Sequence, residues 1–181
     1  SPPEHSFVCQ IGPSKIRTHK SLCRGMVDIL KFQGCNVDLE KHIPRLYKTR
    51  DGEVKEAILD VAFFTPVETF QHVIDITVRC PYVHKTKSKM SLTSIIPGAA
   101  AAIGQNDKKT RHGASVIPLP FETFGRLGSR SQNHLRAISQ WITNYRQPRG
   151  RDMYAQIRLK LERILLFNFS DFVMLSLGGS M

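Results

Sequence analysis

Two apolar segments decide the fold of this chain: AILDVAFF at residues 57–64 and HVIDITVRC at residues 72–80. Both are rich in β-branched and aromatic residues, which favour strands. Because each run is almost continuously apolar, we expect both faces of each strand to be covered. The short linker between them predicts a hairpin. Each segment is interrupted by one carboxylate, Asp60 or Asp75, so the hairpin brings two acids into the centre of a sheet.

The sequence before this hairpin predicts an irregular arm, a helix and a strand. Residues 1–14 contain three prolines and form the expected arm. Apolar residues recur with helical spacing over 18–33, with Thr18 as the expected N-cap and Gly34 as the stop. Residues 35–43 alternate in polarity and predict a strand that pairs with the hairpin.

The sequence around and after the hairpin predicts two connections, a helix and a last strand. Asp51-Gly52 favours a turn within residues 48–55. The basic, polar stretch at 83–97 predicts a loop, and the alanine-rich stretch at 98–111 favours a helix. Residues 114–121 favour an extended strand, and their two prolines suit the edge of a sheet.

Two amphipathic helices, expected over 131–145 and 153–175, complete the chain. The predicted order is α-β-β-β-α-β followed by these two helices, which is an α/β fold with a mixed sheet flanked by helices. The third strand, the crossover helix and the fourth strand would form a βαβ unit. We therefore divide the chain into an arm at 1–14, a core at 15–128 and a C-terminal helical extension at 129–181.

The charge of the chain favours a polyanionic partner. Its 181 residues include 26 Lys and Arg against 15 Asp and Glu, for a net charge of +11. Nucleic acid is the first class of partner that such a balance indicates and an anionic membrane surface the second, although solubility alone also accounts for it. Hydrophobic residues make up 41% of the chain, which excludes a disordered tail.

The four cysteines indicate free thiols and no zinc. Cys9, Cys23, Cys35 and Cys80 form no CxxC pair. Cys9, His19 and Cys23 offer three ligands, but no fourth ligand is evident, and structural zinc sites use four. We therefore expect no zinc.

The most apolar stretch is too short for a membrane span. Residues 164–177 number 14 and include Asp171, whereas a spanning helix needs about 20 residues. We expect this helix to pack on the sheet or to contact a protein partner. Because the sequence begins at Ser1, we also expect a processed product or a fragment.

Acidic residues in the predicted strands suggest a cation site. Asp60 and Asp75 are both expected to be buried, and burying an unpaired carboxylate costs several kcal/mol. With Glu40 on the preceding strand, the acids can converge on a divalent cation, or each can instead cap a loop or pair with a lysine. Lys108 and Lys109 can stabilise charge developing on a phosphate, or form a solvated helix end.

Basic residues in loops and at helix ends are candidates for contact with a phosphate backbone, with a solvated surface as the alternative. The nucleic-acid-binding candidates are Lys85, Lys87, Lys89, Lys109, Arg111, Arg149 and Arg151.

Four segments in this order resemble the restriction-like endonuclease domain of the PD-(D/E)xK superfamily, as found in non-LTR retrotransposon proteins. They are RTHKSLCRGMVDILKFQGCNVDLEKHIP, AILDVAFF, HVIDITVRCPY and KKTRHGASVIPLPFETFGRLG. The resemblance covers most of residues 15–178 and implies a restriction-endonuclease-like fold. Two residues depart from the family pattern: Leu59 replaces a proline, and His112 stands where a tyrosine is expected.

The resemblance implies a metal-dependent nuclease. Glu40, Asp60 and Asp75 would hold Mg²⁺ or Mn²⁺, and Lys108 would join the two aspartates as a catalytic residue. The implied reaction hydrolyses a DNA phosphodiester and nicks a target strand.

A catalytically silent copy of the fold is the alternative. It would bind RNA or DNA, or serve as a structural subunit of a large assembly such as an organellar ribosome. We expect a nuclear location for a working retrotransposon enzyme and an organellar one for a repurposed copy.

Overall fold

The computed structural model describes residues 13–44, 48–50, 53–55, 57–66, 68–81, 93–123, 125–143 and 153–178. Several predictions from the sequence lie outside this range. They concern most of the arm at 1–14, the Asp51-Gly52 turn, and the basic residues Lys85, Lys87, Lys89, Arg149 and Arg151.

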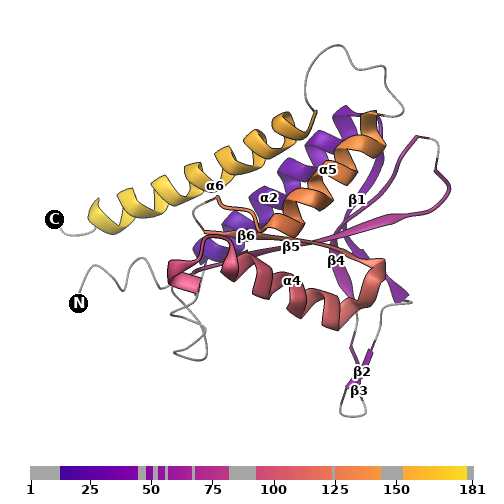
Figure 1. The fold of residues 1–181 in the computed structure, drawn as a ribbon, viewed down its shortest axis with the longest axis horizontal. Helices are drawn as coiled ribbons and strands as arrows, with labels where there is room; N and C mark the ends of the chain where they lie inside the picture. Colours follow the sequence, from indigo (N-terminus) through magenta and orange to yellow (C-terminus); the bar gives the residue numbers. More distant parts are fainter. Residues whose placement is uncertain are drawn as a thin grey trace.

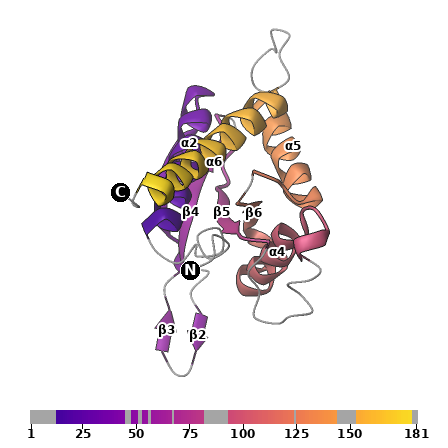
Figure 2. The same cartoon turned by 90° about the vertical axis from the view of Figure 1, so that its left-hand side faces the viewer.

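The structure is a mixed α/β fold built on a four-stranded sheet with the order β1-β4-β5-β6. The strands are β1 (Asn36–His42), β4 (Ile58–Phe64), β5 (His72–Arg79) and β6 (Ile117–Glu122). Strand β4 pairs antiparallel with both β1 and β5, whereas β5 and β6 run parallel. The predicted hairpin is thus confirmed, and its two strands are the central ones. A small separate hairpin, β2 (Lys48–Arg50) with β3 (Glu53–Lys55), projects from one end of the molecule (Figures 1 and 2).

Helices cover both faces of the sheet. The parallel strands β5 and β6 are joined through α4 (Ala99–His112) and a short 3₁₀ turn, η2 (Gly113–Ser115), as the sequence predicts. Helix α4 covers one face, whereas α2 (Pro13–Phe32), α5 (Ser129–Thr143) and α6 (Met153–Gly178) lie over the other (Figures 1 and 2).

The edge position of β6 explains how the sheet accepts two prolines. Pro118 and Pro120 are two residues apart, so their backbone nitrogens point to the same side of the strand. The carbonyl of Pro120 accepts a hydrogen bond from Ser131 Oγ at 3.2 Å, away from β5. The missing N–H groups therefore face away from β5, on the side where the described residues form only the isolated bridge Phe121↔Leu127.

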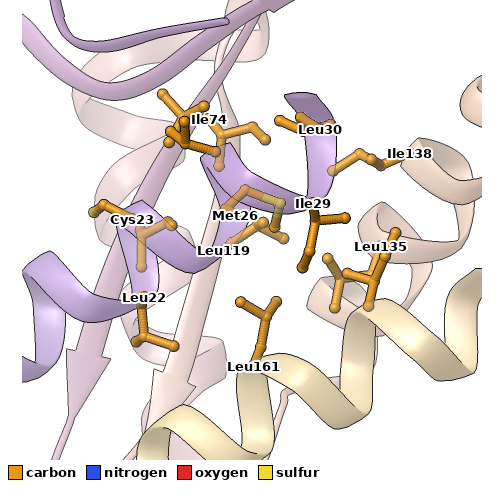
Figure 3. Packing of buried hydrophobic residues seen from close by; sticks show 14 of the residues in the cluster. Leu22, Cys23, Met26, Ile29, Leu30, Ile74, Leu119, Leu135, Ile138 and Leu161 are labelled. Carbon is orange, nitrogen blue, oxygen red and sulfur yellow. The ribbon is translucent and has the colours of Figure 1, made fainter. Parts of the chain in front are cut away.

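The larger hydrophobic core joins the sheet to the three helices on one face. Leu22, Met26 and Leu30 from α2 pack with Leu119 of β6 and Leu161 of α6 (Figure 3). All five side chains are fully buried. The two C-terminal helices therefore share one core with the sheet.

Helix α2 differs from its prediction at one end only. The helix begins at Pro13 rather than after Thr18, so the predicted N-cap at Thr18 is wrong. Proline is tolerated in the first turn of a helix, because its missing N–H would have no helical partner there. The predicted stop is confirmed: Gly34 has φ 81°, and the N–H groups of Gly34 and Cys35 donate to the carbonyls of Lys31 and Leu30.

Replacing Gly34 with alanine is expected to lower the free energy of unfolding by about 1 kcal/mol, because a Cβ is strained in the left-handed conformation. Urea unfolding followed by circular dichroism measures this change. Arg24→Ala, an exposed substitution within the same helix, is the control and should change stability by less than about 0.5 kcal/mol. Equal stability of Gly34→Ala and the wild type would contradict the assigned helix end.

Candidate functional site

The central strands β4 and β5 stop pairing at the level of the two aspartates. Their register runs from Phe63↔His72 to Val61↔Ile74 and does not extend to Asp60. Leu59 clusters with Val73, whereas Val61 clusters with Ile74. Since the successive residues Val73 and Ile74 point to opposite faces of β5, Leu59 and Val61 do too, although residues two apart in a regular strand share a face. The side-chain alternation of β4 therefore breaks at Asp60.

The Asp60 carboxylate replaces the missing backbone pairing. Its Oδ2 accepts a hydrogen bond from the backbone N–H of Ile76 at 2.6 Å. His19 of α2 contacts both residues: its Nε2 lies 3.3 Å from Asp60 Oδ2 and 3.1 Å from the carbonyl oxygen of Ile76. The hydrogen bond with Asp60 raises the pKa of His19, against the effect of burial. Asp60 is thus held from both the next strand and the helix above the sheet.

Asp75 is the more deeply buried of the two carboxylates and meets α4. Lys108 Nζ donates to its Oδ1 at 2.8 Å, and His112 Nε2 lies 3.5 Å from its Oδ2. Only 6% of the Asp75 side chain is exposed. Burial raises the pKa of Asp75 to about 6; the Lys108 ammonium opposes this rise, and the Asp60 carboxylate adds to it. The influence of Asp60 means that the two acids share one electrostatic environment.

A second ion pair fixes α4 against the sheet. Arg79 lies four residues after Asp75, on the same face of β5, and its Nη2 donates to Asp107 Oδ2 at 2.7 Å. A Cβ at Gly104 would come within 3.1 Å of the Arg79 side chain, so the glycine leaves room for this arginine to cross the helix. These contacts set the position of α4, and with it the position of Lys108.

Buried Glu122 of β6 anchors the other end of α4. One of its carboxylate oxygens accepts a hydrogen bond from the backbone N–H of Ala100 at 3.1 Å. A carboxylate is favourable there, because the first N–H groups of a helix lack partners and carry partial positive charge.

The remaining predicted site residues that the structure describes are Glu40, Lys109 and Arg111. Glu40 occupies the β1 position opposite Asp60, between the pairs Leu39↔Val61 and Lys41↔Leu59. Its side chain is exposed, and its backbone has φ 52°, so both strands are distorted at the same level. Lys109 and Arg111 are exposed on the last turn of α4.

Three further described residues lie beside the aspartates. The sequence analysis considered His19 and Cys23 as metal ligands together with Cys9 and set them aside for lack of a fourth ligand, and it gave His112 no role. His19, Cys23 and His112 all contact the aspartates or one another. The i,i+4 spacing of His19 and Cys23 was a visible signal, since it places both on one helix face. For His112, the only signal was its departure from the tyrosine of the resembling family.

Two grooves in the described part of the chain lie away from the aspartates. One, of about 610 Å³, runs between α2 and α6, and its lining includes Ser21, Arg163 and Phe167. The other, of about 520 Å³, lies beside Arg126, Arg158 and Glu162. Within the described part of the chain, no helix combines the length and hydrophobicity that crossing a bilayer requires.

No protein-family model matches the sequence, and no curated protein matches it. The geometry of the aspartate pair therefore carries the functional argument.

Proposed function

We propose that this chain is a metal-dependent DNA endonuclease of retrotransposon origin with a restriction-endonuclease-like fold. One observation carries the proposal: Asp60 and Asp75, from adjacent central strands, share an environment with Lys108 of the crossover helix. Two carboxylates and a lysine are the residue types that phosphodiester hydrolysis needs, for cation binding and for stabilising developing negative charge.

The order of the elements supports the fold part of the proposal. A helix leads into three antiparallel strands, and a crossover helix then leads to a fourth strand parallel to the third. This is the α-β-β-β-α-β order implied by the resemblance. Helices α5 and α6 follow it on the face that α2 covers (Figure 1).

The residues present fit Mg²⁺ or Mn²⁺. Asp75 Oδ2 is buried and accepts no hydrogen bond from the described residues, so one oxygen remains available as a ligand. Both cations prefer oxygen ligands and are commonly bound by one or two carboxylates together with substrate phosphates. Asp60 and Asp75 would hold the cation, with Glu40 as the third acid of the proposed set. The bound cation would supply Lewis acidity at the phosphate to be cleaved.

The residues of the chain would orient the carboxylates, stabilise the developing charge and contact the phosphates. The Ile76 N–H and His19 orient the Asp60 carboxylate, and Lys108 orients Asp75. The Lys108 ammonium also has further hydrogens to donate, since it carries three and gives one to Asp75. It can direct one toward the phosphate, where negative charge accumulates in the transition state. Lys109 and Arg111, on the adjacent exposed turn, are suited to contact the flanking phosphates.

The test is nicking of supercoiled plasmid DNA by the purified chain with Mn²⁺ or Mg²⁺. We expect conversion to open circles with either metal and none with EDTA. An Asp60→Asn, Asp75→Asn double variant, purified in parallel, should show no nicking. Persistent nicking in the double variant, or no nicking by the wild type, would refute the endonuclease.

A second candidate is a catalytically silent copy of the fold, which binds RNA or DNA or forms part of a large assembly such as an organellar ribosome. It is favoured by exposed apolar side chains on α6, namely Leu159, Leu166 and Phe167, of which Phe167 is 69% exposed. Such a surface suits a protein partner. This candidate predicts salt-sensitive nucleic-acid binding that does not depend on divalent metal.

A further inference from the structure

A second group of potential metal ligands lies beside the aspartate pair. Of the residues that the structure describes, His19, Cys23 and Asp60 bring one nitrogen, one sulfur and one oxygen ligand within 4.8 Å of one another. Cys23 Sγ lies 3.8 Å from each ring nitrogen of His19, and His19 Nε2 lies 3.3 Å from Asp60 Oδ2. The two helix residues come from successive turns of α2, and the third ligand comes from β4.

These separations match those between ligands on a tetrahedral zinc ion. With Zn–N and Zn–O bonds of about 2.0 Å and a Zn–S bond of about 2.3 Å, neighbouring ligand atoms lie roughly 3.3–3.6 Å apart. The separation of His19 from Asp60, 3.3 Å, lies in this range, and that of His19 from Cys23, 3.8 Å, exceeds it by a few tenths of an ångström. Small rotations of the His19 and Cys23 side chains would bring all three ligand atoms, which lie within 4.8 Å of one another, to bonding distance of one ion.

The surroundings of Cys23 favour a cation. Burial raises the pKa of its thiol, and the negative charges of Asp60, Glu40 and Asp75 raise it further. The same three carboxylates that disfavour a lone thiolate attract a positive ion to that position.

We propose that His19, Cys23 and Asp60 form a site for Zn²⁺ or a similar thiophilic divalent ion. Thiolate and imidazole ligands select zinc, whereas Mg²⁺ requires oxygen. Three protein ligands leave the fourth position open to water, as in zinc sites other than purely structural ones. The expectation of no zinc rested on linear spacing, and the ligand from β4 is one that spacing does not reveal.

The site has a consequence for the proposed nuclease, because Asp60 belongs to both ligand sets. Zinc held by His19 and Cys23 would occupy the carboxylate that Mg²⁺ or Mn²⁺ needs. Zinc is therefore expected to inhibit nicking. The binding site itself rests on the helix residues and stands whether or not the chain cleaves DNA.

Cobalt titration of the reduced, purified chain tests the site, since Co²⁺ substitutes for zinc and gives an absorption band when a thiolate binds it. We expect a saturable band at one Co²⁺ per chain, removed by equimolar Zn²⁺ and unaffected by a thousandfold excess of Mg²⁺. Cys23→Ser should lose the band and bind at least ~100-fold more weakly, since even outer contacts to a ligand are worth 10- to 100-fold. Cys35→Ser, at another buried cysteine, is the matched control and should retain both the band and the affinity.

His19→Gln provides a second variant that leaves the thiol in place, and it should also weaken Co²⁺ binding. No band in the wild type, or an unchanged band in Cys23→Ser, would overturn the proposal, as would a band lost in Cys9→Ser instead. Cobalt binding is measured without DNA, and nicking is measured with Mn²⁺ on wild-type protein freed of zinc, so failure of the zinc site and failure of the nuclease give different results.

Discussion

Asp75→Asn is expected to abolish nicking and, at the same time, to make the metal-free protein more stable. The loss of activity should be at least about 1000-fold, because the variant removes the charge that would hold the cation. The gain in stability follows from the buried position of Asp75. Asparagine keeps the shape of the side chain, and its carbonyl oxygen still accepts a hydrogen bond from Lys108.

The stability effect has a defined pH dependence. The folded-state pKa of Asp75, about 6, lies above its ordinary value of 3.8, so the folded state resists ionisation. Wild-type stability therefore falls, relative to the asparagine variant, as the pH rises from about 4 through 6, and the difference then stays constant. At pH 7 the variant should be more stable by about 1–3 kcal/mol, given 1.36 kcal/mol per pKa unit. At pH 3.5 the two proteins should be equally stable.

Urea unfolding in EDTA at a series of pH values measures this difference. Asp107→Asn is the matched control, because Asp107 forms an exposed ion pair between the same helix and strand. Exposed pairs contribute about 0–1 kcal/mol, so this variant should be slightly less stable than wild type and should still nick DNA. If Asp75→Asn were less stable than wild type at pH 7, Asp75 would be a structural counter-ion for Lys108.

The sequence predicted the sheet well because its central strands carry strong, local signals. Apolar runs, each broken by one carboxylate, identified β4 and β5 as central, and two prolines identified β6 as an edge strand. The distortion at Glu40 had no such signal. Its segment alternates in polarity like a regular strand, whereas in the sheet its backbone is left-handed, at the position opposite Asp60 of β4. The start of α2 was wrong because Thr18 is a good N-cap residue that tertiary structure overrides.

The sequence does not show which site residues come together in space, whereas the structure does. The spacing of Asp60 and Asp75 predicted neighbouring strands, but the register that brings their charges together is a property of the sheet. Cys23 and Asp60 are 37 residues apart, so no local pattern joins them. The contacts of Lys108 likewise depend on how α4 is anchored by Arg79 and Glu122.

Lys108→Met should slow nicking by about 100- to 1000-fold and should also destabilise the protein. Methionine retains an apolar stem but removes the ammonium, so Asp75 loses its lysine partner and keeps His112 Nε2 at 3.5 Å. Breaking a buried pair costs about 3–5 kcal/mol when the remaining charge is trapped. Asp75 can take up a proton instead, which limits the expected loss at pH 7 to about 1–3 kcal/mol.

Single-turnover nicking and urea unfolding, measured on the same preparations, separate the two roles of Lys108. Lys109→Met is the matched control, since Lys109 is the exposed neighbour on the same helix. Its stability should change by less than about 0.5 kcal/mol, and its main effect should be weaker, more salt-sensitive DNA binding.

An Asp75→Asn, Lys108→Met double variant should regain part of the stability lost in Lys108→Met, because no buried charge is then left unpaired. If Lys108→Met lost stability but nicked DNA at the wild-type rate, the lysine would serve only to neutralise Asp75. The ion pair would then be a structural feature, and the proposed catalytic role would be left to the two aspartates without Lys108.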